Sequence, residues 1–193
     1  ASSKSLQIIT NAVEDGTKTL RRILEFARRD SASDFAPVEL NYLLTSSLDI
    51  ARPKWQSKSR NIEVKIEGGS PVYVMGEQAE LREVVLNLIF NAVDAMPDGG
   101  VMEVGVRGEI ESGCFWVADT GSGMPPEVAS RIFEPFFTTK GKSGSGLGLS
   151  ASHGIINRHK GEILVVSEPG EGTRFEVRLP ICEKNDRFVK NSE

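Results

Sequence analysis

Apolar positions along residues 81–96 follow helical spacing and leave one polar line on the same helix. Steps of three and four residues keep side chains on a single stripe, because each residue turns the helix by ~100°. The polar members of this stripe are Glu83, Asn87, Asn91 and Asp94. A helix that is apolar on most sides is usually buried, and buried polar groups need partners. The pattern predicts a core helix that presents a polar line to a ligand. A solvated stripe on an amphipathic helix fits these residues, taken alone, equally well.

A second helical pattern runs over residues 4–29, where apolar positions alternate steps of three and four for about three heptads. The seam is weakened at Gly16. A lone amphipathic helix usually has a wider apolar stripe, so the pattern favours half of a helical hairpin or a dimeric bundle. We assign residues 1–30 to a partial dimerisation hairpin. The polar, proline-ended stretch 31–37 is predicted to be a linker.

The remaining chain alternates strands and helices. Helices are predicted over residues 38–60, with an interruption at Pro53, and over 147–158. Strands are predicted where apolar residues alternate with polar ones or run on between turns, at 62–66, 72–75, 101–106, 114–118, 163–166 and 173–179. The order indicates an α+β domain over 38–182, a mixed sheet with helices on one face and 114–118 as a central strand. Residues 183–193 are charged and predicted to be a frayed tail.

Composition narrows the class of protein. The 193 residues are 39% hydrophobic and 26% charged, which is typical of one globular domain with or without an appendage. The formal net charge of −4 argues against nucleic acid as a partner. No apolar run approaches the length of a membrane span, and the two cysteines, Cys114 and Cys182, lack metal-ligand spacing. We expect a cytoplasmic protein with reduced thiols, and leave open whether a longer parent protein is membrane-anchored.

The predicted central strand ends in Asp119-Thr-Gly121-Ser-Gly123. A carboxylate at a strand end, followed by two glycines, suits the close approach of a flat ligand to the backbone. Such a carboxylate can accept a hydrogen bond from an exocyclic amine, for example that of adenine. An Asp-initiated turn after a strand, with no ligand, explains the same residues in isolation.

A glycine-rich run at residues 144–148 leads into the helix predicted from Leu147. Free N–H groups and the helix dipole make such a run suitable for anions, and Lys140 just before it can reach a phosphate. The run also matches a dinucleotide fingerprint, Gly146-x-Gly148-x-x-Ala151. That fingerprint must follow a buried strand, and residues 138–144 cannot form one.

Four motifs follow one another in a fixed order. They are Asn87-x3-Asn91-Ala, Asp119-x-Gly121-x-Gly123, Phe133-Glu-Pro-Phe-Phe and Gly144-x-Gly146-Leu-Gly148-Leu. In this order they resemble the N box, first glycine box, F box and second glycine box of sensor histidine kinases, members of the GHKL ATPase superfamily. The run from Glu134 to Lys140, after Asn-Ala-x-Asp-Ala-Met-Pro, is similar to kinases of the nitrogen-regulation type. The resemblance covers about residues 38–181.

The resemblance implies a Bergerat-fold ATP site in a two-layer α/β sandwich. Asp119 would bind the adenine amine, with Thr173 nearby. Asn87 would supply a Mg²⁺ ligand and Asn91 a phosphate contact. A single amide oxygen is enough, because Mg²⁺ keeps several waters and shares phosphate oxygens. Glu83, one turn before Asn87, would orient the reactants or accept a proton.

The glycines of the second box would cradle the phosphates. Residues about 124–145 would form an ATP lid, packed by Phe133, Phe136 and Phe137. Besides the catalytic pair Glu83 and Asn87, the full set of nucleotide-binding residues that we expect is Asn87, Asn91, Asp94, Asp119, Gly121, Gly123, Phe133, Thr138, Lys140, Gly144, Ser145, Gly146, Leu147, Gly148 and Thr173.

The chain departs from the family pattern at the phosphoacceptor. Kinases of this family phosphorylate a histidine on the first helix of a dimerisation hairpin, but residues 1–60 contain no histidine. The two histidines, His153 and His159, lie on the helix after the glycine box, and we interpret both as structural.

Residues 4–29 therefore resemble only the second helix of that hairpin. The expected activity is transfer of the ATP γ-phosphoryl group to a histidine on an absent helix. The expected partners are that helix, a second copy in a homodimer of the parent protein, and a response-regulator receiver domain. The alternative is a nucleotide-binding switch without phosphotransfer.

Overall fold

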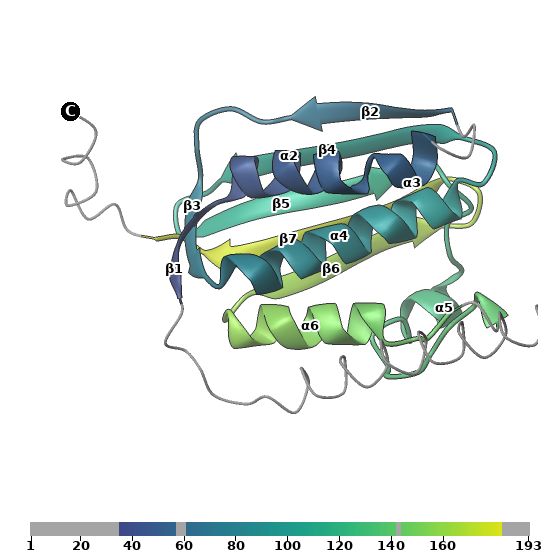
Figure 1. Ribbon diagram of the computed structural model, residues 1–193. Coiled ribbons are helices and arrows are strands. Elements are labelled where there is room, and N and C mark those ends of the chain that lie inside the picture. The colour runs from purple at the N-terminus through teal and green to yellow at the C-terminus, as the bar shows by residue number, and fades with distance from the viewer. Residues whose placement is uncertain (1–34, 57–60, 142–143, 183–193) are drawn as a thin grey trace, which may run out of the picture.

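The computed structural model describes residues 35–56, 61–141 and 144–182 of the chain (Figure 1). The predicted hairpin helix within residues 1–30, residues 31–34 of the predicted linker, and the predicted tail at 183–193 lie outside the described residues. Within them, the fold is a sheet with helices on one face, as the sequence predicts. No helix of the described part is long and apolar enough to cross a membrane.

Five strands form the main sheet in the order β2-β4-β5-β7-β6. Their bounds are β2 (Ile62–Glu67), β4 (Gly100–Gly108), β5 (Ser112–Asp119), β6 (Glu162–Glu168) and β7 (Gly172–Pro180). The β2–β4 pair is parallel and the other pairs are antiparallel, which confirms a mixed sheet. The apolar run at 114–118 lies in β5, the middle strand, because a strand flanked on both sides by other strands is shielded on its edges as well as its faces.

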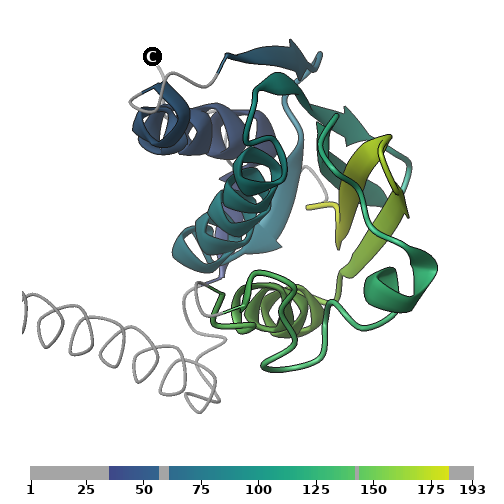
Figure 2. The same ribbon diagram turned by 90° about the vertical axis from the view of Figure 1, so that its right-hand side faces the viewer.

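Three longer helices cover one face of this sheet, as Figure 2 shows from the side: α2 (Leu40–Ala51), α4 (Gln78–Ala95) and α6 (Gly148–Arg158). Two short helices, α3 (Pro53–Gln56) and α5 (Pro126–Ala129), lie in connecting segments. Helix α4 packs between α2 and α6 and also contacts β5. Its apolar side chains are fully buried against Phe115 and neighbouring sheet residues, at Leu81, Val84, Val85, Leu88, Ile89 and Val93.

The helix predicted from residue 38 begins at Leu40, because residues 36–39 form a strand instead. This strand, β1 (Ala36–Glu39), pairs antiparallel with β3 (Tyr73–Gly76). The same prediction treated the helix as one segment with a kink. In the structure α2 ends at Ala51 and Pro53 begins the separate helix α3, since proline fits the first turn of a helix and disrupts its interior. Residues 57–60 of that prediction lie outside the described residues.

Candidate functional site

A cavity of about 450 Å³ lies at one end of the sheet, between α4, the end of β5, the start of β7 and the segment that joins α5 to α6. Twelve of the expected site residues line it: Asn87, Asn91, Asp94, Asp119, Gly123, Thr138, Lys140, Gly144, Ser145, Gly146, Gly148 and Thr173. Residues that are far apart in sequence therefore meet in one place. A more open hollow of about 860 Å³, lined in part by residues 109–112 and 160–162, lies at the opposite ends of β5 and β7. It contains none of the motif residues.

Asp119 occupies one end of this cavity as the last residue of β5. It lies opposite Thr173 of β7 in the strand register, and both residues are buried, at 8% and 7% exposure. The Gly121 N–H donates a hydrogen bond of 2.9 Å to Asp119 Oδ1. Burial raises the pKa of Asp119 to about 6, although the N–H groups of Gly121 and Thr173 act in the opposite direction. A buried carboxylate of this kind is suited to accept a hydrogen bond from a ligand.

The two glycines after Asp119 let the chain turn tightly against the ends of β6 and α4. A Cβ on Gly123, whose φ is 61°, would lie 1.8 Å from the Glu168 carbonyl oxygen. A Cβ on Gly121 would lie 2.5 Å from the carbonyl oxygen of Ala95 at the end of α4. The turn is also tied to β6, since the Met124 N–H donates to Ser167 Oγ at 2.8 Å. These contacts fix the backbone around Asp119 from both the sheet and the central helix.

Asn87 lies midway along α4 and faces the start of α6. Its Nδ2 donates to the Gly148 carbonyl at 3.1 Å and to Ser152 Oγ at 3.2 Å. Because the amide nitrogen has two acceptors on α6, Oδ1 is the atom that can face a ligand. A Cβ on Gly148 would lie 3.2 Å from this Oδ1, so the glycine keeps the approach to Asn87 open.

Asn91 and Asp94 continue the polar line of α4 and meet two lysines. Lys140 Nζ donates to Asn91 Oδ1 at 3.1 Å and to Asp94 Oδ2 at 2.9 Å. Lys54 Nζ lies 3.0 Å from Asp94 Oδ1 and 4.5 Å from the centre of the Phe90 ring. Burial of Asp94 favours a raised pKa, but the hydrogen bonds and charges of Lys140 and Lys54 outweigh it and lower the pKa.

The glycine-rich run approaches the cavity from the loop side. Gly146 has a φ of 65°, and a Cβ there would lie 2.3 Å from the Phe136 carbonyl carbon, so only glycine fits. The Phe136 N–H in turn donates to the Gly146 carbonyl at 2.9 Å. Helix α6 begins at Gly148, which places the N-terminus of an 11-residue helix at the cavity. This arrangement favours an anionic group at that end.

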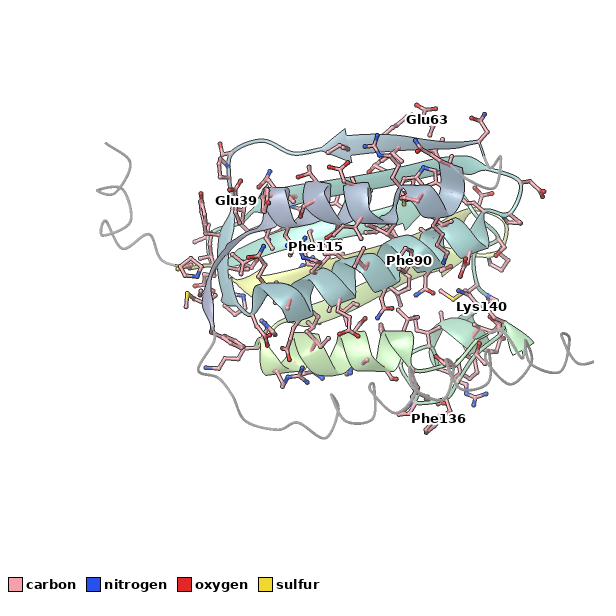
Figure 3. The ribbon with its side chains drawn as sticks, viewed as in Figure 1. Glu39, Glu63, Phe90, Phe115, Phe136 and Lys140 are labelled. Atoms are coloured by element: carbon pink, nitrogen blue, oxygen red, sulfur yellow. The ribbon has the colours of Figure 1, made fainter. Side chains whose placement is uncertain are left out.

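The three phenylalanines expected to pack the lid do not behave alike. Phe133 and Phe137 are half-buried against the core, and Phe137 lines the cavity. Phe136 is 67% exposed, so the expectation that it packs the lid is wrong. Figure 3 shows its side chain on the outer side of the loop, directed away from the helices. The reason is local: Phe136 has a φ of 67°, which turns its side chain away while its backbone pairs with Gly146.

Four expected site residues do not line the cavity. Gly121 and Leu147 shape the backbone beside it, and Phe133 packs behind it against His153, with ring centres 5.1 Å apart. Glu83 lies one turn before Asn87, half-buried on α4. Sequence reasoning also missed several lining residues, notably Lys54, Phe90, Met124, Leu149 and Phe175. Phe90, Leu149 and Phe175 follow helix or strand patterns that predict only burial, and Met124 lies in the segment between β5 and α5. Lys54 precedes every motif, and no pattern marks it.

The structure supports a structural role for both histidines. His159 is buried, and its Nε2 accepts a 3.0 Å hydrogen bond from the Glu77 N–H at the start of α4. Its ring stacks on Phe35, with ring centres 4.5 Å apart. His153 pairs with Asn157 one turn along α6. Neither histidine lines the cavity.

The fold and the cavity together define a class of protein, a sheet covered by helices on one face in which a buried carboxylate at a strand end and a helix N-terminus line one cavity. The comparisons with known proteins identify the family. Residues 76–183 match the family described as "Histidine kinase-, DNA gyrase B-, and HSP90-like ATPase". The chain belongs to this family, and its described residues form the ATP-binding catalytic domain found in two-component kinases.

Curated relatives and solved structures agree with this assignment. The chain is 45% identical to sporulation kinase A of Bacillus subtilis over 109 residues, which are 56% of this chain and 18% of that protein. It is 36% identical to the sensor kinase CckA of Brucella abortus over 202 aligned residues, covering 93% of this chain and 21% of the relative. It resembles the histidine kinase ThkA, solved in complex with the response regulator protein TrrA, with a TM-score of 0.73 and 25% identity over 91% of this chain and 50% of that chain. The chain spans only about a fifth of the two curated relatives.

Proposed function

We propose that the cavity binds ATP with Mg²⁺ and that the protein transfers the γ-phosphoryl group to a histidine of a partner helix. One observation carries this proposal: a single cavity joins a buried carboxylate at a strand end to a helix N-terminus and an asparagine oxygen. These are the groups needed for an adenine, a polyphosphate and a metal ion.

Asp119 would recognise the adenine. Its carboxylate would accept a hydrogen bond from the exocyclic amine, and Thr173 lies opposite it in the strand register, where it also lines the cavity. The apolar lining residues Met124, Val128, Ile132, Phe137 and Phe175 would cover the ring faces. Burial of Asp119 strengthens this contact, because a hydrogen bond to a charged group is worth more away from water.

The opposite end of the cavity fits the phosphates. Gly144, Gly146 and Gly148 present backbone without side chains, and the first turn of α6, whose N–H groups have no acceptor within the helix, begins at the cavity. Among the described residues no group of three His, Cys, Asp or Glu side chains could hold a metal ion. Mg²⁺ does not require one, because it binds through few protein ligands, waters and phosphate oxygens. Asn87 Oδ1 would hold it, where it would neutralise phosphate charge.

Phosphoryl transfer requires that this domain position the reactants and neutralise the charge of the phosphates, and it requires no covalent catalysis by the domain. The acceptor imidazole nitrogen would bond to the γ-phosphorus as the bond to the β–γ bridging oxygen breaks, and ADP would leave. Glu83, one turn before Asn87 on α4, would orient the imidazole or accept its proton. Thr138 and Lys140 would close on the phosphates from the loop, and Asn91 would contact them from α4.

The partners of the parent protein follow from the same proposal. The acceptor histidine would belong to a dimerisation hairpin of the same protein, and the phosphoryl group would pass to a response-regulator receiver domain. The ThkA–TrrA structure supports the second partner, since a relative of similar fold was solved with its regulator. We also propose a cytoplasmic location and, from the run Glu134–Lys140, the nitrogen-regulation subfamily.

A phosphotransfer assay tests the proposal. The 193-residue chain is mixed with a hairpin domain that carries an acceptor histidine, together with Mg²⁺ and ATP labelled at the γ-phosphate. We expect acid-labile label on the hairpin domain, none on the chain alone, and none with Asn87→Ala. Glu83→Gln should lower the rate of transfer without changing ATP affinity. Tight ATP binding with no transfer to any acceptor would favour the nucleotide-binding switch instead.

A further inference from the structure

Asp94 is shared between two lysines that come from different parts of the chain. Lys54 on α3 contacts one carboxylate oxygen at 3.0 Å, and Lys140 on the loop before α6 contacts the other at 2.9 Å. All three residues line the cavity. Figure 3 shows Phe90 on α4 and Lys140 beside the segment that joins α5 to α6. The two amines therefore flank one carboxylate on the wall of the proposed nucleotide cavity.

The two lysines differ in how firmly they are held. The residue after Lys54, Trp55, is 5% exposed and packs in the main core. The Lys54 Nζ atom lies over the Phe90 ring. Lys140 is flanked by exposed Thr139 and Gly141. Both amines have a second contact, Lys54 with the Phe90 ring and Lys140 with Asn91. The backbone differs: a buried neighbour anchors Lys54, whereas an exposed loop gives up little packing when Lys140 moves. Lys140 is thus the amine that can exchange partners.

The charges make such an exchange costly unless Asp94 keeps a counter-ion. With both lysines in place the group carries one net positive charge, which favours a polyphosphate. If Lys140 left for a phosphate and Asp94 had no other partner, a carboxylate would face the polyphosphate within the same cavity. Like charges a few ångströms apart repel, and partial burial weakens the screening by water.

We propose that Lys140 moves from Asp94 to the phosphates when a nucleotide binds, and that Lys54 is a positioning residue that stays on Asp94 and neutralises it. Lys54 then promotes phosphate binding without touching the phosphate. The same movement releases Asn91 Oδ1, which Lys140 also holds at 3.1 Å, so that the Asn91 amide can turn to the ligand. This inference rests on the proposed function, since it needs a polyphosphate in the cavity.

The proposal predicts that the effects of two substitutions depend on each other. Lys54→Met should weaken Mg-ATP binding about three- to tenfold, because Asp94 then competes for Lys140 and repels the phosphates. Adenosine binding should stay within about twofold, since the ligand has no phosphate. Asp94→Asn should raise ATP affinity by about two- to fivefold, because it frees Lys140. The double variant should bind ATP at least as tightly as the wild type.

Titration calorimetry of the 193-residue chain with adenosine and with Mg-ATP measures these affinities. Lys65→Met and Asp49→Asn are matched controls, because both residues form ion pairs on the surface, with Glu63 at 4.0 Å and Arg52 at 2.9 Å. Neither control should change ATP affinity. Two-dimensional NMR of Lys140 Nζ should show it leaving Asp94 when ATP binds to the wild type.

Two outcomes would overturn the inference while leaving the proposed function intact. If the double variant binds ATP as weakly as Lys54→Met, Lys54 contacts the phosphates itself. If Lys54→Met weakens adenosine and ATP equally, its role is to support the fold around Phe90. A wild-type chain that bound neither ligand would instead refute the proposed function, and the inference with it.

Discussion

The two ends of the cavity are built in different ways. The Asp119 end is assembled from β5, β6 and β7. The strand register places Asp119 opposite Thr173, and a hydrogen bond of 2.9 Å connects Ser167 Oγ with Thr173 Oγ1. The other end is built from one face of α4 and a loop in which Thr139, Lys140 and Gly141 are exposed. Its polar groups are partly engaged with one another, as Lys140 is with Asn91 and Asp94.

The difference shows where specificity and regulation reside. A strand end that is hydrogen-bonded to neighbouring strands keeps its geometry with or without a ligand, so the Asp119 end is suited to select an adenine. Ordering a glycine-rich loop costs about 1–2 kcal/mol per residue, and a ligand that satisfies its N–H groups offsets that cost. The loop end can therefore respond to the number of phosphates, which is what a phosphoryl-transfer site requires.

The largest expected effect is a loss of stability when the Asp119 end is altered. Gly123→Ala should lower the free energy of unfolding by about 2–5 kcal/mol, because it combines a positive φ with a clash against the Glu168 carbonyl. Gly170→Ala is the matched control, since its φ is also positive, at 84°, but nothing lies within 4 Å of the added methyl. It should cost only about 1–2 kcal/mol. Urea unfolding of both variants measures the difference, and equal losses would show that the turn is not closely packed.

At the loop end, Asn87→Ala should separate metal-dependent from metal-independent binding. The change removes the proposed Mg²⁺ ligand and the two contacts to α6, so Mg-ATP affinity should fall about 10- to 100-fold. ADP in the presence of EDTA should bind nearly as it does to the wild type. Parallel titrations with the two ligands check this, and an equal loss for both would remove Asn87 from the metal site.

The raised pKa of Asp119 predicts that ligand affinity depends on pH through the Asp119 end of the cavity alone. The adenine amine needs the carboxylate form, and the unliganded carboxyl takes up a proton as the pH falls through about 6. Adenosine affinity should thus be constant above pH 7 and about tenfold weaker at pH 5. Adenosine is the right ligand because it has no phosphate to titrate. The dependence should vanish in Asp119→Asn, and its persistence there would assign it to another group.

The smallest effects distinguish two neighbouring aromatic residues of the loop. Phe137→Ala should weaken ATP binding about two- to fivefold, because Phe137 lines the cavity and packs under Arg131, whose guanidinium lies 4.4 Å from the ring centre. Phe136→Ala should change it less than about twofold, since its side chain is exposed. Hydrogen exchange on the loop of each variant, with and without an ATP analogue, completes the comparison. A larger effect from Phe136 would mean that the loop rearranges on binding.

Much of the fold could be predicted because local patterns decide it. The 3.6-residue period marked the central helix α4, and the apolar run at 114–118 marked the middle strand. Strand β1 is not evident in the sequence: residues 36–37 were assigned to the linker and residues 38–39 to the start of a helix. Only four residues long, β1 is defined by pairing with β3, about 35 residues later. Pairing between distant segments of this kind leaves little trace in a short sequence window.

The candidate site likewise contains residues that the sequence predicts and residues that it does not. Residues that carry a motif, such as Asn87, Asp119 and Gly148, were predicted and lie together at the cavity. Lys54 was not predicted, because its place in the cavity depends on tertiary packing. Helix α3 contacts α4, and its Trp55 is buried. Phe136 was assigned to the packed side because composition alone cannot show the positive φ that turns it outward.

The central claim is that the adenine of ATP lies on Asp119, and calorimetry of Asp119→Asn with ADP tests it most directly. The amide oxygen is a neutral and therefore weaker acceptor than the carboxylate, so affinity should fall about 10- to 100-fold. Thermal unfolding in parallel should show that the variant is folded. A folded Asp119→Asn chain that bound ADP as tightly as the wild type would contradict the account.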